Sequence, residues 1–293
     1  MNYREKALSI ACEGEQLLGI LSSPAPGRPS RKTGVVIIVG GPQYRVGSHR
    51  QFVLLARSLA VKGYDCLRVD YRGMGDSSGG SRDFLAVGAD IDAAVKALRQ
   101  EQGDLERVVL WGLCDAASAC LLFVDEFGPR ANVDGLCLLN PWVRTPASLA
   151  RTQVKHYYLQ RLKEREFWLK LLSGKVAASA VSGLVRSIMQ VLRPPNAAAA
   201  AAAQDVPFNL RMARAWKQFS GPIQLVLSGE DYTAKEFLEQ VASESAWSGA
   251  LHHPRLSRAD LTEADHTFSR RADALELEAI CCRWLDQLQP QVA

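Results

Sequence analysis

The sequence lacks several features that would point to a particular partner or compartment. It contains no uninterrupted apolar run of the ~18–20 residues that a membrane-spanning helix needs. Its net charge is only +4 over 293 residues, and no basic stripe is interleaved with aromatic side chains, which argues against nucleic-acid binding. No cysteine pair has CxxC spacing for zinc, and no G-x-G-x-x-G or P-loop spacing supports a nucleotide. We therefore expect a small-molecule substrate, no metal and no cofactor.

Cysteine usage and the start of the chain bear on location. The seven cysteines are an odd number without regular spacing, which fits a reducing compartment. The polar start, Met1 to Lys6, predicts that there is no signal peptide. We expect a cytoplasmic protein, whose oligomeric state the sequence leaves open.

Apolar runs typical of buried strands alternate with helical patterns along most of the chain. The first strands form a hairpin over residues 6–22, around Glu13-Gly14-Glu15. Further strands are predicted at 34–39, 64–70, 107–111, 133–139, 221–227 and, more weakly, 254–261, and helices at 48–61, 84–100 and through 281–288. This alternation predicts an α/β protein with a mostly parallel sheet and helices on both faces.

The alternation stops near Trp142 and resumes near residue 220. The intervening stretch is helical, amphipathic and locally basic, and it includes seven alanines at 197–203, to which we assign no function. We expect residues 1–142 and 220–293 to form the core and residues 143–219 to form a helical cap over the active site.

The most informative segment is Gly112-Leu113-Cys114-Asp115-Ala116. It lies between an apolar run and an alanine-rich stretch, and it resembles the nucleophile elbow of the α/β-hydrolase fold, with cysteine in place of serine. Small residues flank the nucleophile there because strand and helix come very close. The alternative, a cysteine that merely packs in the core, is the usual role for this residue type and is our interpretation of the other six.

A cysteine nucleophile needs a base, and the base needs an orienting acid. His266 follows the last predicted strand and Asp231 follows the strand before it, so both should reach the sheet edge that carries Cys114. The nucleophile–acid–base order fits this fold. A surface position for His266 and a helix N-cap role for Asp231 are the alternatives, and Glu230 is the rival acid.

The oxyanion formed during acyl transfer needs backbone N–H donors. The residue after the nucleophile, Asp115, should supply one, and Gly41 in the glycine-rich loop after the third strand should supply another, with Gln43 as second choice. We place Tyr44, His49 and Trp142 at the substrate.

Three segments carry a closer family resemblance. Asp70-Tyr71-Arg72-Gly73-Met74-Gly75-Asp76-Ser77 is similar to a segment that shapes the sheet edge of α/β-hydrolases without being catalytic. The stretch from Gly40 to Arg50, the elbow, and Asp265-His266-Thr267-Phe268 together resemble the exosortase A system-associated hydrolase 1 family. That resemblance implies an α/β-hydrolase from bacterial exopolysaccharide and protein-sorting gene clusters.

Three functions follow as hypotheses. The first is a hydrolase with a Cys-His-Asp triad that cleaves an ester, thioester or lactone through an acyl-cysteine intermediate. An acyltransferase would use the same residues and pass the acyl group to an alcohol or amine. The third is a non-catalytic binding protein on a hydrolase fold.

Overall fold

The computed structural model of the protein describes residues 2–41, 43–145 and 206–289. The chain divides into two compact units, Met1–Val143 with Leu210–Ala293, and Arg144–Asn209. Most of the second unit, including the alanine tract and most of the expected cap at 143–219, lies outside the described residues, so the cap stays a prediction.

An eight-stranded sheet with the order β1-β2-β4-β3-β5-β6-β7-β8 organises the first unit. The strands are β1 (Tyr3–Cys12), β2 (Glu15–Pro24), β3 (Thr33–Ile38), β4 (Asp65–Val69), β5 (Arg107–Leu113), β6 (Gly135–Leu139), β7 (Ile223–Glu230) and β8 (Leu256–Asp265). The first two form the predicted antiparallel hairpin, β2 pairs antiparallel with β4, and all later pairs are parallel. The predicted fold class, an α/β-hydrolase fold with a mostly parallel sheet, is confirmed.

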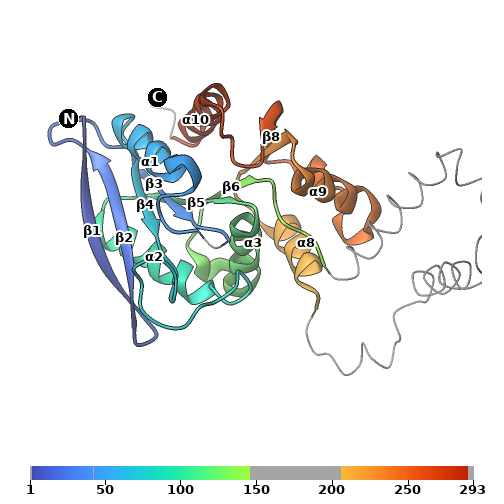
Figure 1. Cartoon of the computed structure of the whole chain (residues 1–293), viewed down its shortest axis with the longest axis horizontal. Helices are drawn as coiled ribbons and strands as arrows, with labels where there is room; N and C mark the ends of the chain where they lie inside the picture. The colour runs from blue at the N-terminus through green and yellow to red at the C-terminus, as the bar shows by residue number, and fades with distance from the viewer. Residues whose placement is uncertain (1, 42, 146–205, 290–293) are drawn as a thin grey trace, which may run out of the picture. The chain divides into compact units, whose positions relative to one another are not determined.

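Helices cover both faces of this sheet. They are α1 (Gln51–Val61), α2 (Gly88–Glu101), α3 (Asp115–Phe127), α8 (Phe208–Gln218), α9 (Tyr232–Ser243) and α10 (Arg271–Gln287). Figure 1 shows α1 and α10 side by side on one face, whereas α2 and α3 lie together on the other. Parallel strands sandwiched in this way are apolar on both sides, which is why β3, β4 and β6 are buried throughout.

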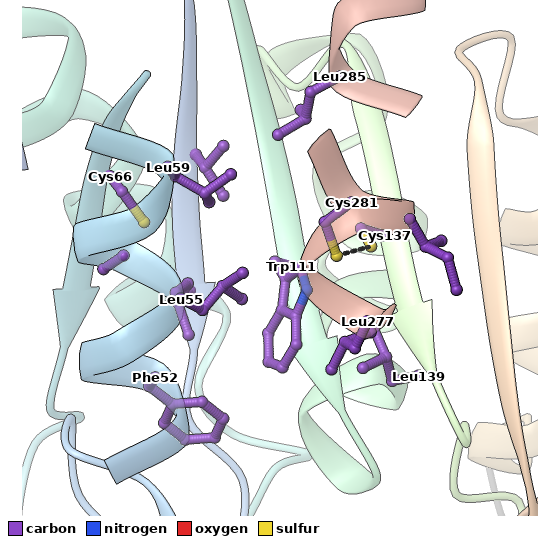
Figure 2. Packing of buried hydrophobic residues seen from close by; sticks show 14 of the residues in the cluster. Phe52, Leu55, Leu59, Cys66, Trp111, Cys137, Leu139, Leu277, Cys281 and Leu285 are labelled. Atoms are coloured by element: carbon purple, nitrogen blue, oxygen red, sulfur yellow. Dashed lines mark hydrogen bonds between the residues drawn. The ribbon is translucent and has the colours of Figure 1, made fainter. Parts of the chain in front are cut away.

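The core under α1 and α10 is built from alternate residues of the central strands. Val35 and Ile37 of β3 and Trp111 of β5 face these helices, and Figure 2 shows Leu55 and Leu59 of α1 on one side of this core and Leu277, Cys281 and Leu285 of α10 on the other. The ring of Phe52 meets that of Trp111 edge-on, with centroids 5.6 Å apart. This packing fixes the sheet and therefore the strand ends that carry the site.

Two predicted helices differ at their starts. The helix expected from residue 48 begins at Gln51, after a short 3-10 turn, because His49 and Arg50 adopt positive φ angles of 53° and 61°. The helix expected from residue 84 begins at Gly88. Both differences lie in loops at the carboxyl ends of strands, where tertiary contacts override helical periodicity.

Candidate active site

Cys114 occupies the sharp turn between β5 and α3. Its backbone has φ 63° and ψ −124°, a conformation that costs a non-glycine residue about 1–3 kcal/mol. The turn is held from both sides, because the Cys114 N–H donates to the Leu139 carbonyl at 2.9 Å and the Cys114 carbonyl accepts from the Ala117 N–H at 3.1 Å. The strained backbone therefore presents the side chain at the strand end.

The small residues around Cys114 are required by the close approach of strand and helix. A Cβ on Gly112 would lie 2.6 Å from the backbone carbonyl carbon of Ala116, closer than real Cβ atoms come. Ala116 itself is fully buried. The geometry thus has the features of the elbow that the sequence pattern indicated.

His266 and Asp231 meet at the same edge of the sheet. Asp231 follows β7 and His266 lies in the loop after β8, and the His266 Nδ1 is 2.8 Å from Asp231 Oδ2. The Asp231 carboxylate also accepts from the backbone N–H groups of Thr233 (3.0 Å) and Ala234 (3.4 Å) at the start of α9. The two interpretations of Asp231 are therefore compatible: one carboxylate caps a helix and orients an imidazole.

The electrostatics of this pair favour a charged imidazole. Hydrogen bonds from the ring to Asp231 and then to Cys114 raise the pKa of His266 to about 10, against a smaller opposing effect of burial. Since Nδ1 faces Asp231, Nε2 is the nitrogen left for the Cys114 sulfur.

Two residues to which the sequence analysis assigned no role at the site, Asp265 and Asn140, position the His266 loop. Asp265 accepts from the backbone N–H groups of Thr267 (3.1 Å) and Ser269 (2.9 Å), which tightens the turn around the histidine. Asn140, fully buried at the end of β6, donates to the Ser228 hydroxyl at 2.8 Å and to the His266 carbonyl at 3.5 Å. A polar Asn directly after an apolar strand was the available signal.

A pocket of about 390 Å³ brings most of the expected site residues together. Its lining comprises Gly40, Gly41, Gln43, Phe52, Phe84, Leu113, Cys114, Asp115, Trp142 and His266. Tyr44 lines a neighbouring pocket of about 570 Å³, which shares five of these residues, namely Gly40, Gly41, Gln43, Phe84 and Asp115. His49 lines a separate pocket between α1 and α10, and Cys114 is not part of its lining.

The expected oxyanion donors have hydrogen-bond partners of their own. The Gly41 N–H donates to Asp115 Oδ2 at 2.8 Å, and the Gln43 side-chain oxygen accepts from the Ser48 N–H at 3.1 Å. Their assignment to an oxyanion stays a prediction.

The remaining cysteines differ from Cys114 in exposure. All seven lie in the described part of the chain and are unpaired, and six are buried while Cys114 is partly exposed. Burial raises the pKa of the Cys66 thiol to about 12 and that of the Cys282 thiol to about 11. These environments suit packing rather than nucleophilic attack.

The segment from Asp70 to Ser77 is structural. The Asp70 carboxylate accepts from the Arg45 N–H at 2.6 Å and from the Asp76 N–H at 3.2 Å. Gly75 packs against the same carboxylate so closely that a Cβ on Gly75 would lie 2.2 Å from Asp70 Oδ2. Arg72 makes a buried ion pair with Asp90 at 2.8 Å.

Within residues 2–41, 43–145 and 206–289, no group of three or more His, Cys, Asp or Glu side chains could hold a metal ion, and no helix is long and apolar enough to cross a membrane.

Solved structures of hydrolases share this architecture. An esterase from Pyrococcus furiosus is 14% identical over 98% of this chain and 92% of its own, with a TM-score of 0.64. Est1E from Butyrivibrio proteoclasticus with bound ferulic acid is 15% identical over 96% and 99% of the two chains, with a TM-score of 0.60. XC6422 from Xanthomonas campestris, described as an α/β serine hydrolase without lid, is 12% identical over 99% and 97%, with a TM-score of 0.58.

At such low identity these likenesses describe the fold alone, and no curated protein matches the chain. A family model, in contrast, matches residues 35–276, which span β3 to α10 and include Cys114, Asp231 and His266. The chain therefore belongs to the alpha/beta hydrolase family.

Proposed function

We propose that this protein is an acyl hydrolase in which Cys114 is the nucleophile, His266 the general base and Asp231 the acid that orients the imidazole. The observation that carries the proposal is the His266 ring, which is bonded to Asp231 at 2.8 Å and lines the same pocket as Cys114. A hydrogen bond to Cys114 is also among the causes that raise the pKa of His266.

The first half of the reaction forms an acyl-cysteine. The Cys114 proton passes to His266 Nε2, and this transfer gives the charged imidazole that the hydrogen bonds with Asp231 and Cys114 favour. The thiolate attacks the carbonyl carbon of an ester, thioester or lactone while the carbonyl electron pair moves onto oxygen. When the oxyanion collapses, the bond to the leaving group breaks and the His266 proton goes to that group. Asp231 stabilises the imidazolium throughout, because its carboxylate faces Nδ1.

In the second half, water cleaves the thioester. His266 takes a proton from the water, which attacks the acyl carbon, and the proton then returns to the Cys114 sulfur as the carboxylic acid leaves. The ferulic acid bound to Est1E supports a small carboxylic acid as product here. The resemblance to exosortase-associated hydrolases supports an acyl substrate from an exopolysaccharide or exosortase system.

An acyltransferase would follow the same first half and replace water with an alcohol or amine. The neighbouring pocket of about 570 Å³ supports this second candidate, because it adjoins the Cys114 pocket and offers space for an acceptor. Product analysis with and without a sugar acceptor distinguishes the two, since only transfer yields an acylated sugar.

The test is a panel of p-nitrophenyl esters and acyl-thioesters assayed with wild type and Cys114→Ala. We expect turnover that Cys114→Ala abolishes, together with an acyl adduct on Cys114 detected by intact mass. Cys120→Ala is the matched control, because Cys120 lies six residues further along on α3 and is fully buried. Turnover that persists in Cys114→Ala contradicts the triad, and substrate binding without turnover by the wild type indicates a binding protein.

A further inference from the structure

One N–H group expected to bind an oxyanion, that of Gly41, already donates to a carboxylate of the chain itself. The Asp115 carboxylate accepts from the Gly41 N–H at 2.8 Å, and the nearby backbone N–H groups of Ala116 and Asp115 act to lower the pKa of this carboxyl group. In this fold, the oxyanion formed at Cys114 is expected to bind to two backbone N–H groups, those of Gly41 and Asp115. The carboxylate therefore lies where the reacting carbonyl oxygen would have to be bound.

This arrangement is built into the packing around the elbow. A Cβ on Gly40 would lie 2.1 Å from Asp115 Oδ1, so the carboxylate occupies space that only glycine leaves free. Burial raises the pKa of the Asp115 carboxyl group, and the N–H groups of Gly41, Ala116 and Asp115 oppose that effect. Because burial disfavours the charged form of this group, the hydrogen bond from the Gly41 N–H is a specific contact that holds the carboxylate in this place.

The same side chain has room to leave. Asp115 lines both the pocket of Cys114 and the neighbouring pocket of about 570 Å³. Rotation about the Asp115 side-chain torsions would free the Gly41 N–H without moving the backbone, which the elbow holds in place.

We propose that Asp115 is a positioning residue whose carboxylate keeps the Gly41 N–H occupied and must be displaced by a substrate carbonyl oxygen. The proposal rests on the proposed acyl transfer at Cys114. Two negative charges, the carboxylate and the developing oxyanion, compete for the same donor, so Asp115 slows acylation of Cys114 and favours substrates whose binding energy moves it aside. One such donor contributes about 10²–10³ to the rate of acyl transfer, so its prior occupation has a measurable cost.

The experiment compares two reactions of the same sulfur in wild type, Asp115→Ala and Asp115→Asn. Acylation by p-nitrophenyl acetate forms an oxyanion, whereas alkylation by iodoacetamide displaces iodide and forms none. We expect Asp115→Ala to raise the acylation rate about tenfold or more relative to the alkylation rate, because the Gly41 N–H becomes free. Asp115→Asn keeps the shape without the charge and should give a smaller rise.

Asp104→Ala, which removes an exposed carboxylate from the loop before β5, is the control and should leave the ratio unchanged. Thermal unfolding verifies that each variant is folded, and Asp115→Asn retains the polar group at the start of α3 should Asp115→Ala unfold. An unchanged or lower acylation-to-alkylation ratio in both Asp115 variants, with an active wild type, overturns this proposal alone. Absence of acylation in wild type and both variants, with alkylation intact, overturns the proposed function as well.

Discussion

Two neighbouring strands place cysteines in opposite environments. The parallel register pairs Trp111 of β5 with Cys137 in the middle of β6, and Cys114 comes three residues after Trp111, just beyond the end of its strand. Figure 2 shows Cys137 beside Cys281 of α10 and close to Trp111, and the two sulfurs are 3.9 Å apart. Both are 1% exposed.

The difference lies in the partners that each position offers. In the core, burial raises the pKa of the Cys137 thiol well above its usual range. At the elbow, Cys114 is partly exposed and shares a pocket with His266. A step of about 10 Å along parallel strands thus separates an inert thiol from one beside a base.

The largest expected difference is in chemical reactivity. In the folded protein at pH 7, iodoacetamide should modify Cys114 about 10³-fold or more faster than the six buried cysteines, because those thiols need local or global opening. Peptide mapping by mass spectrometry over time measures each rate. The fast modification should be absent in Cys114→Ala, and a core cysteine that reacts as fast as Cys114 would contradict the contrast.

A single added methyl group, in Gly112→Ala, should disturb the backbone of the elbow. Gly112→Ala should destabilise the protein by about 1–3 kcal/mol, the usual cost of overpacking, because the new Cβ meets the Ala116 backbone at 2.6 Å. It should also lower the acylation rate of Cys114. Urea unfolding measures the first effect, with Gly103→Ala as control, since nothing lies within 4 Å of a Cβ there. Equal stability of the two variants would mean that the turn tolerates a wider separation.

A change confined to the core should lower stability but leave the reactivity of Cys114 unchanged. Cys281→Ala removes a buried sulfur that contacts Cys137 and should cost about 1–2 kcal/mol in urea unfolding. The alkylation rate of Cys114 should remain that of the wild type. A slower alkylation would show that the core and the elbow are energetically coupled.

The smallest expected effect is the pH dependence of stability, because solvent screens the partly exposed His266 side chain and weakens its ion pair. The folded pKa of His266 is raised from 6.5 to about 10, so its contribution is fully present below pH 6.5 and is lost as pH rises through about 10. The urea midpoint of the wild type should therefore fall towards that of His266→Asn between pH 7 and 10.5. Parallel curves for the two proteins would contradict the ion pair with Asp231.

Much of the fold was predictable because buried parallel strands leave a strong apolar signal. The runs 34–39 and 221–227 correspond to β3 and β7 within a few residues. The start of α1 was not predictable, since the positive φ angles of His49 and Arg50 depend on contacts formed only in the folded chain. Helical periodicity carries no information about such contacts.

For the candidate site, order along the chain and strand ends were sufficient to bring His266 and Asp231 together. The sequence pattern marked Asp115 for its backbone N–H alone. The position of its carboxylate depends on the missing Cβ of Gly40, 75 positions earlier, and on the Gly41 N–H. This contact between the loop after β3 and Asp115 depends on packing in the folded chain, so no local sequence pattern predicts it.

Because the Asp231 carboxylate bonds both to His266 and to the first turn of α9, that turn should respond to changes in the charge of His266. Protonation or alkylation at the active site changes the charge that Asp231 faces through His266. The same carboxylate accepts hydrogen bonds from the N–H groups of Thr233, at Oδ1, and Ala234, at Oδ2. The amide NMR resonances of these two residues would thus follow the chemistry of Cys114 without a probe in the pocket.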